Sequence, residues 1–159
     1  MAPEKQGEGE ATPSLNEALA DLGPRQVALG KLDLKIVDAV KKLEEKLRAR
    51  LSTRVVTSIS LDETTERVEV LAFGKHDGRW QLLIESGDLD QPEFWKKQPL
   101  ASASREMRVR VFTGGFMENL VRDAAKQLDD QIAERHDAIK IADRLLDALG
   151  EEAGDGIPF

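Results

Sequence analysis

The chain has 159 residues and no cysteine, so one domain with appendages is expected, and disulfides, thiolate metal sites and cysteine nucleophiles are excluded. A formal net charge of -7 argues against a nucleic-acid partner, but residues 14–117 hold 17 basic and 16 acidic side chains. The net negative charge therefore comes from the ends of the chain and from the last predicted helix. No apolar run approaches the roughly 18 residues of a membrane span, and we expect a soluble, cytoplasmic protein.

Residues 1–13 mix Pro, Gly, Glu, Gln and Thr with few apolar residues, which is typical of a disordered arm. Ser14 and Glu17 form a capping-box pattern for a short helix over 15–22, which Gly23-Pro24 should end. From Leu29 to Leu51, apolar residues recur in steps of three and four with charges between them. This spacing predicts an amphipathic helix.

The apolar period then changes to two, which predicts strands over 54–61, 66–73 and 79–85, with a hairpin at 74–78. Arg105–Phe112 alternates apolar and cationic residues and predicts a fourth strand. The expected fold class is α+β, with a four-stranded antiparallel sheet flanked by helices that pack on its inner face. Trp80 is expected to face this core.

One face of the predicted sheet collects arginine and phenylalanine, whereas a merely solvated face would mix Lys, Glu and Thr. Sequence-tolerant binding of a single strand needs cations along the backbone and aromatic surfaces for the bases. The residues predicted to supply these contacts are Arg54, Arg67, Phe73, Arg79, Arg108, Arg110 and Phe112, with Trp95, Lys96 and Lys97 as a clamp over one edge. Three alternatives stay open: the arginines only solubilise an edge strand, Phe94 and Trp95 only cover the sheet, or the N-terminal segment buries this face.

Thr113-Gly114-Gly115 is predicted to lead into a helix that runs without a breaker to Leu149. At 1.5 Å per residue, about 35 helical residues extend about 50 Å, roughly twice the length of an eight-residue strand. The C-terminal half therefore needs a partner, and its three-four spacing predicts a coiled-coil homodimer. The dimerisation residues expected within 118–149 are Leu128, Ile132, Ile139, Ala142, Leu146 and Leu149. The alternative is a helix that bends back over its own domain, 14–117.

Residues 150–159 form an acidic tail, expected to be disordered, that ends in apolar residues. Its predicted docking residues are Asp155, Ile157, Pro158 and Phe159, because carboxylates can steer towards a basic surface while an apolar end enters a pocket. His76 in a turn and His136 on a charged helix face pair with no nucleophile. Neither an enzyme nor a bound cofactor or metal is expected.

The ending Asp155-Gly156-Ile157-Pro158-Phe159 resembles the acidic tip of bacterial single-stranded-DNA-binding proteins, although Gly156 stands where that tip usually keeps an acid. The whole layout looks more like ThermoDBP, an archaeal family that replaces the oligonucleotide-binding barrel with a helix-flanked antiparallel sheet and dimerises through a leucine-zipper-like C-terminal helix. The resemblance implies a homodimer that binds single-stranded DNA with little sequence preference and recruits replication or repair proteins through its tail. RNA binding stays open. A dimeric adaptor or chaperone without nucleic-acid binding is the alternative.

Overall fold

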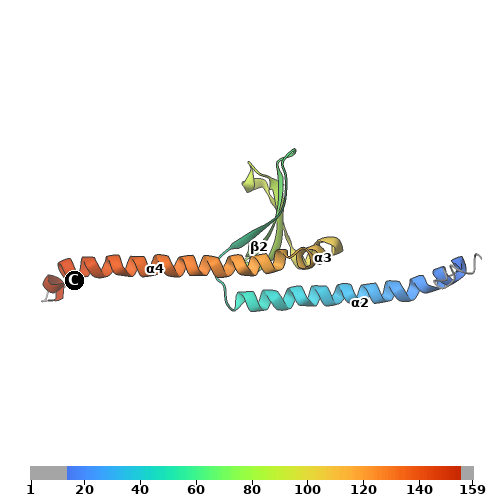
Figure 1. Cartoon of the computed structure of the whole chain (residues 1–159), viewed down its shortest axis with the longest axis horizontal. Coiled ribbons are helices and arrows are strands. Elements are labelled where there is room, and N and C mark those ends of the chain that lie inside the picture. The colour runs from blue at the N-terminus through green and yellow to red at the C-terminus, as the bar shows by residue number, and fades with distance from the viewer. Residues whose placement is uncertain (1–13, 155–159) are drawn as a thin grey trace, which may run out of the picture.

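A computed structural model of the chain describes residues 14–154, with side chains as far as Gly150. It confirms the predicted α+β class, with an open antiparallel sheet of order β1-β2-β3-β4 and a long C-terminal helix. The elements are α2 (Leu15–Arg48), β1 (Val55–Asp62), β2 (Arg67–His76), β3 (Arg79–Asp88), β4 (Lys96–Pro99), α3 (Arg105–Thr113) and α4 (Phe116–Gly154), with 3-10 turns η2 (Pro92–Phe94) and η3 (Leu100–Ser102). The sheet rises from one side of the helices, and α2 and α4 extend past it in opposite directions (Figure 1).

Helix α2 is continuous where the sequence predicted two separate helices. The capping box at its start is confirmed, because the Ser14 hydroxyl accepts from the Glu17 N–H and the Glu17 carboxylate accepts from the Ser14 N–H. Pro24 lies inside the helix, so the predicted stop at Gly23-Pro24 is wrong. Proline removes one backbone hydrogen bond but keeps a helical φ, so the helix can continue through Gly23-Pro24 despite the low helix propensity of both residues.

The strands form a simple meander in which each pairs antiparallel with the next. The β2–β3 hairpin turns at Asp77 and Gly78, whose φ angles are 53° and 74°. Asp-Gly suits a two-residue turn because both residues tolerate positive φ better than most. The register places Phe73 opposite both Val55 and Leu82.

Helices cover one face of the sheet, which we call the helix-covered face. Its strand residues are Val55, Thr57, Ile59, Leu71, Phe73, Trp80, Leu82 and Ile84. They pack against buried side chains of all three helices, among them Val40 of α2, Val111 of α3 and Leu120 of α4. Trp80 stacks on Phe73 with ring centroids 5.5 Å apart, which confirms that it faces the core.

The segment Arg105–Phe112 belongs to helix α3, so its prediction as the fourth strand is wrong. Ser104 caps the helix by accepting a hydrogen bond from the Met107 N–H. Alternation suggested a strand, but Met107 and Val111 are four apart and also share one side of a helix. The fourth strand is instead the short β4, which pairs with β3.

Helix α4 is unbroken, as the sequence predicted, but it runs for 39 residues to Gly154 rather than ending at Leu149, so residues 150–154 of the predicted disordered tail are helical. Its first turns bury Met117, Leu120 and Ala124 against the sheet, whereas Ile132 and Leu146 further along are more than half exposed. The C-terminal half therefore overhangs the sheet (Figure 1). Among the described residues, no helix is both long and apolar enough to cross a membrane.

Candidate nucleic-acid interface

The predicted outer face combines residues that the structure places on opposite faces of the sheet. Because Leu71 pairs with Ile84 and Phe73 with Leu82, these four residues share the helix-covered face. The sequence prediction instead put Phe73 on the outer face. The stretch Val70–Phe73 is apolar at every position, so alternation does not distinguish its two faces. Only the pairing with β3 decides which residues point towards the helices.

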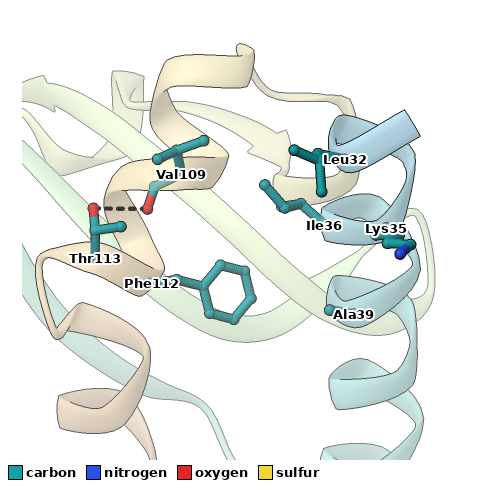
Figure 2. Close-up of a pocket in the computed structure, with 7 residues that line it drawn as sticks. All are labelled: Leu32, Lys35, Ile36, Ala39, Val109, Phe112 and Thr113. Carbon is teal, nitrogen blue, oxygen red and sulfur yellow. Dashed lines mark hydrogen bonds between the residues drawn. The ribbon is translucent and has the colours of Figure 1, made fainter. Parts of the chain in front are cut away.

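Phe73 is fully buried beneath Trp80, so its predicted role as a stacking surface for bases is wrong. Phe112 lies on α3 and faces α2 rather than the outside of the sheet (Figure 2). Neither ring offers an open surface next to the strand arginines. Both aromatic positions of the predicted sheet face are therefore part of the packing between sheet and helices.

Three of the predicted arginines also lie away from the outer face. Arg67 is exposed and lies on the same side of β2 as the residues of the helix-covered face. Its guanidinium is 3.3 Å from the Asp88 carboxylate. Arg108 donates to the backbone carbonyls of Ala101 and Ala103, which fixes η3 to α3. Arg110 lies 3.7 Å from Glu69 and 5.7 Å above the Phe116 ring. These three side chains do not form one cationic surface with Arg54.

The opposite side of the sheet, which we call the helix-free face, carries a different set of side chains. By register and contact, its residues are Arg54, Val56, Val70, Ala72, Arg79, Gln81, Leu83, Glu85, Trp95 and Lys97. Val70, Ala72 and Leu83 are buried but lie outside the core cluster that contains the helix residues. Helix α2 therefore leaves the centre of this face uncovered in the described chain, although its residues Glu44, Glu45 and Arg48 line a pocket with Arg79 and Gln81 at one end of β3.

Arg54 and Glu85 form an ion pair on the helix-free face. Two hydrogen bonds of 2.6 Å join the guanidinium to the carboxylate. Hydrogen bonding to Glu85 raises the pKa of Arg54, assisted by the charge of that carboxylate and opposed by partial burial. Glu85 is 1% exposed, whereas the Arg54 side chain is 44% exposed, so the acid is hidden and the cation remains accessible. Among the described strand residues of this parity, Glu85 is the only acid.

The Arg54 side chain reaches Glu85 by crossing the backbone of β2. A Cβ built on Gly74 would lie 3.0 Å from Arg54 Nη1, so the glycine leaves room for the guanidinium. The sequence predicted Arg54 as a contact residue but not its pairing with Glu85. The one available signal was a single acid inside the apolar run of β3.

Trp95 forms the outer edge of the helix-free face. Its indole lies against Gly87, where an added Cβ would come within 2.5 Å of the ring, and its Nε1 donates to the Asp88 carbonyl at 2.6 Å. The ring is therefore fixed while remaining half-exposed. Phe94, in contrast, is 74% exposed, so of these two neighbouring aromatics only Trp95 covers the sheet.

The residues of the predicted clamp, Trp95, Lys96 and Lys97, do not all lie on one face, because neighbouring residues of β4 point to opposite faces of the sheet. Lys97 pairs with Glu85 and lies on the helix-free face, whereas Lys96 pairs with Ser86 and has the opposite parity. Arg79, at the start of β3, shares the face of Lys97. The structure thus brings Arg54, Arg79, Trp95 and Lys97 to one side of the sheet.

An apolar groove of about 390 Å³ separates α2 from α3 (Figure 2). Leu32, Ile36 and Ala39 line it from α2, and Val109 and Phe112 line it from α3. Thr113 of α3 also lines it, and its hydroxyl donates to the Val109 carbonyl at 3.0 Å. The groove lies on the side of α3 that faces α2, away from the helix-free face.

The predicted dimerisation residues divide at the edge of the sheet. Leu128 packs against the core, whereas Ile132, Ile139, Ala142, Leu146 and Leu149 are exposed on α4. The predicted disordered arm 1–13 and the docking residues Asp155, Ile157, Pro158 and Phe159 lie outside the described residues.

No protein-family model, curated protein or solved structure matches the chain. Its function is therefore inferred from its own residues and their geometry.

Proposed function

We propose that the chain binds single-stranded DNA with little sequence preference through the helix-free face of its sheet. One observation carries this proposal: Arg54, Arg79 and Lys97 surround a surface whose single strand acid is already paired, and Trp95 supplies an indole beside them. Cations that follow a phosphate backbone, together with aromatic surfaces for bases, are the two requirements of sequence-tolerant single-strand binding.

The pairing of Glu85 matters because a free carboxylate would repel phosphates. With its charge balanced by Arg54 and its oxygens buried, this carboxylate adds little negative potential at the surface. Arg54 keeps a partly exposed guanidinium that can also contact a phosphate. The overall charge of -7 is compatible with this role, because residues 14–117, which carry the binding face, hold 17 basic and 16 acidic side chains and the excess of acid lies outside them.

The proposed active form is a homodimer that pairs through the C-terminal half of α4. Support comes from the exposed apolar residues that recur along this overhang, among them Ile132, Ile139 and Leu146. Two linked binding faces would raise the affinity for a long strand above that of either face alone. We further propose that residues 150–159 recruit replication or repair proteins, as the resemblance of their ending to the bacterial acidic tip implies.

A dimeric protein-interaction module is the second candidate. Val56 on the helix-free face is 40% exposed, as expected if this surface met a protein rather than a nucleic acid. The two candidates differ in salt dependence, because phosphate contacts release counterions and an apolar protein contact does not.

The test is a titration of the full chain with a labelled single-stranded oligonucleotide, its duplex and the matching RNA, each at two salt concentrations. We expect the single strand to bind more tightly than the duplex, with an affinity that falls as salt rises and with quenching of Trp95 emission. A Trp80→Phe variant assigns the optical signal, because the chain has two tryptophans. Absence of binding at low salt would reject the nucleic-acid proposal and favour the protein-interaction module.

The dimer is tested by measuring particle mass by light scattering. Ile139→Glu places a charge in the apolar side of α4 and should halve the mass of the particle. Ile141→Glu is the matched control, because Ile141 is similarly exposed, at 52% against 56%, but lies on another side of the helix. An unchanged mass for the Ile139 variant would contradict pairing through this surface.

A further inference from the structure

The N-terminal half of α2 carries an apolar surface that the described chain leaves uncovered. We call it the α2 stripe, and its residues are Leu15, Leu19, Leu22, Leu29, Leu32 and Ile36. Leu15 is 77% exposed, and Leu19, Leu22, Leu29 and Leu32 are each at least 50% exposed. Further along the same side of the helix, Val40 and Leu47 are buried in the core. The stripe is thus a continuation of the core-facing surface beyond the end of the domain.

The spacing of the α2 stripe reads the same in both directions, with successive steps of four, three, seven, three and four residues. A twofold interface between identical chains requires this self-complementarity, because residue i meets residue j of the partner and j meets i. We propose that the α2 helices of two copies pack antiparallel about a twofold axis between Arg25 and Gln26. Leu19 then lies opposite the partner's Leu32, and Leu22 opposite the partner's Leu29.

The charged residues Glu17, Lys31 and Lys35 lie away from the α2 stripe. At 100° per residue they fall on the other side of α2 from Leu22 and Leu29 and stay exposed when the stripe is covered. The direction of the pairing is therefore set by the apolar spacing alone.

The groove between α2 and α3 provides a place for the end of the partner helix. Ile36 and Leu32 line this groove together with Val109 and Phe112 (Figure 2). In the proposed register the partner's Leu15 lies opposite Ile36, so the first turns of the partner's α2 reach the groove. An apolar cavity of about 390 Å³ is large enough to admit leucine side chains. The second copy thus covers both the stripe and the groove.

This interface is separate from the binding face and from α4. The α2 stripe and the overhang of α4 lie at opposite ends of the molecule (Figure 1). Pairing through α2 therefore leaves the α4 surface accessible, and a chain that uses both contacts assembles beyond a dimer. The inference does not depend on nucleic-acid binding.

Disulfide trapping tests the direction and register directly, because the natural chain has no cysteine. A Gln26→Cys variant should form a disulfide dimer in a glutathione redox buffer, since its two copies lie near the twofold axis. Leu19→Cys alone should not, because antiparallel packing separates its two copies by about 20 Å, well beyond the roughly 7 Å limit between bridged Cα atoms. An equal mixture of Leu19→Cys and Leu32→Cys chains should give the mixed dimer.

Two results would overturn the proposal. Strong trapping of Leu19→Cys with itself would indicate parallel helices, and failure of both Gln26→Cys and the mixed pair would show that α2 does not pair in this register. Trapping is measured on the full chain by non-reducing electrophoresis at several protein concentrations. A specific dimer keeps its pattern as the protein is diluted, until it dissociates.

A second experiment breaks the interface without touching the core. The Leu22→Glu, Leu29→Glu double variant should halve the particle mass in light scattering, because it buries four charges per dimer. Leu34→Glu with Val27→Glu is the matched control, since both residues are more than half exposed but lie on another side of α2. Circular dichroism should show the same helix content in all variants. An unchanged mass in the stripe variant, or an equal loss in the control, would contradict the proposal.

Discussion

The two faces of the sheet are both buried at their centres, but by different means. On the helix-covered face, Phe73 and Leu82 are enclosed by apolar side chains of three helices. On the helix-free face, Leu83 and Ala72 are buried outside the helix-packed core cluster, and the Leu83 side chain lies beside Gly74 together with that of Arg54. The first arrangement stabilises the fold. The second leaves polar and aromatic side chains at the surface, where a ligand can meet them.

The largest difference between the faces should appear in stability. Phe73→Ala removes a fully buried ring from the helix-covered face and should lower the free energy of unfolding by about 4 kcal/mol. Val56→Ala on the helix-free face should cost less than about 1 kcal/mol, because that side chain is 40% exposed. Urea denaturation of both variants gives the comparison. Equal losses would mean that the two faces do not differ as described.

Breaking the ion pair should produce a smaller loss on the helix-free face. Arg54→Met leaves the Glu85 carboxylate buried without its partner and should lower the free energy of unfolding by about 2 to 3 kcal/mol. The value falls below that for a fully buried pair because Arg54 is 44% exposed. Adding Glu85→Leu should recover most of the loss, since no buried charge remains. A double variant as unstable as Arg54→Met would contradict this explanation.

The stacking role of the helix-free face predicts an effect on affinity. Trp95→Ala should weaken binding of a single-stranded oligonucleotide by about 1 to 3 kcal/mol, or roughly 5- to 150-fold, because one base loses its stacking surface. Trp80→Phe on the helix-covered face is the control and should leave affinity unchanged. Fluorescence anisotropy with a labelled oligonucleotide measures both. Equal affinities for the two variants would show that Trp95 does not contact the oligonucleotide.

Elements with strong local signals were predictable from the sequence. The three-four spacing of Leu29–Leu51, the Asp77-Gly78 turn and the long helix after Gly115 all have the expected type. Arg105–Phe112 was misread because its alternation also fits a helix, and the cap at Ser104 decides between them. A local pattern therefore predicts the type of an element only where the residues fit either the helix period or the strand period, but not both.

The residues of the proposed binding face could not be predicted from local patterns, because their positions depend on strand pairing and on contacts between distant residues. Val70–Phe73 is apolar on both sides of the strand, so only the pairing of β2 with β3 assigns these residues to faces. Arg54 and Glu85 are 31 residues apart, and no spacing rule links them. Arg54 and Arg79 share one face as predicted, and Lys97, predicted as part of an edge clamp, lies on that face through β4, whereas Phe73, predicted beside the arginines, belongs to the core.

The most direct test of the helix-free face compares two double variants that remove equal charge from opposite faces. Arg79→Ala with Lys97→Ala takes two cations from the helix-free face, whereas Lys75→Ala with Lys96→Ala takes two exposed cations of the opposite parity. The measurement is the slope of log affinity against log salt for a single-stranded oligonucleotide. We expect the first variant to lower the magnitude of this slope by about 1.4, or about 0.7 per lost phosphate contact, and the second to leave it unchanged. Equal slopes for the two variants, or a larger change in the second, would contradict binding through the helix-free face.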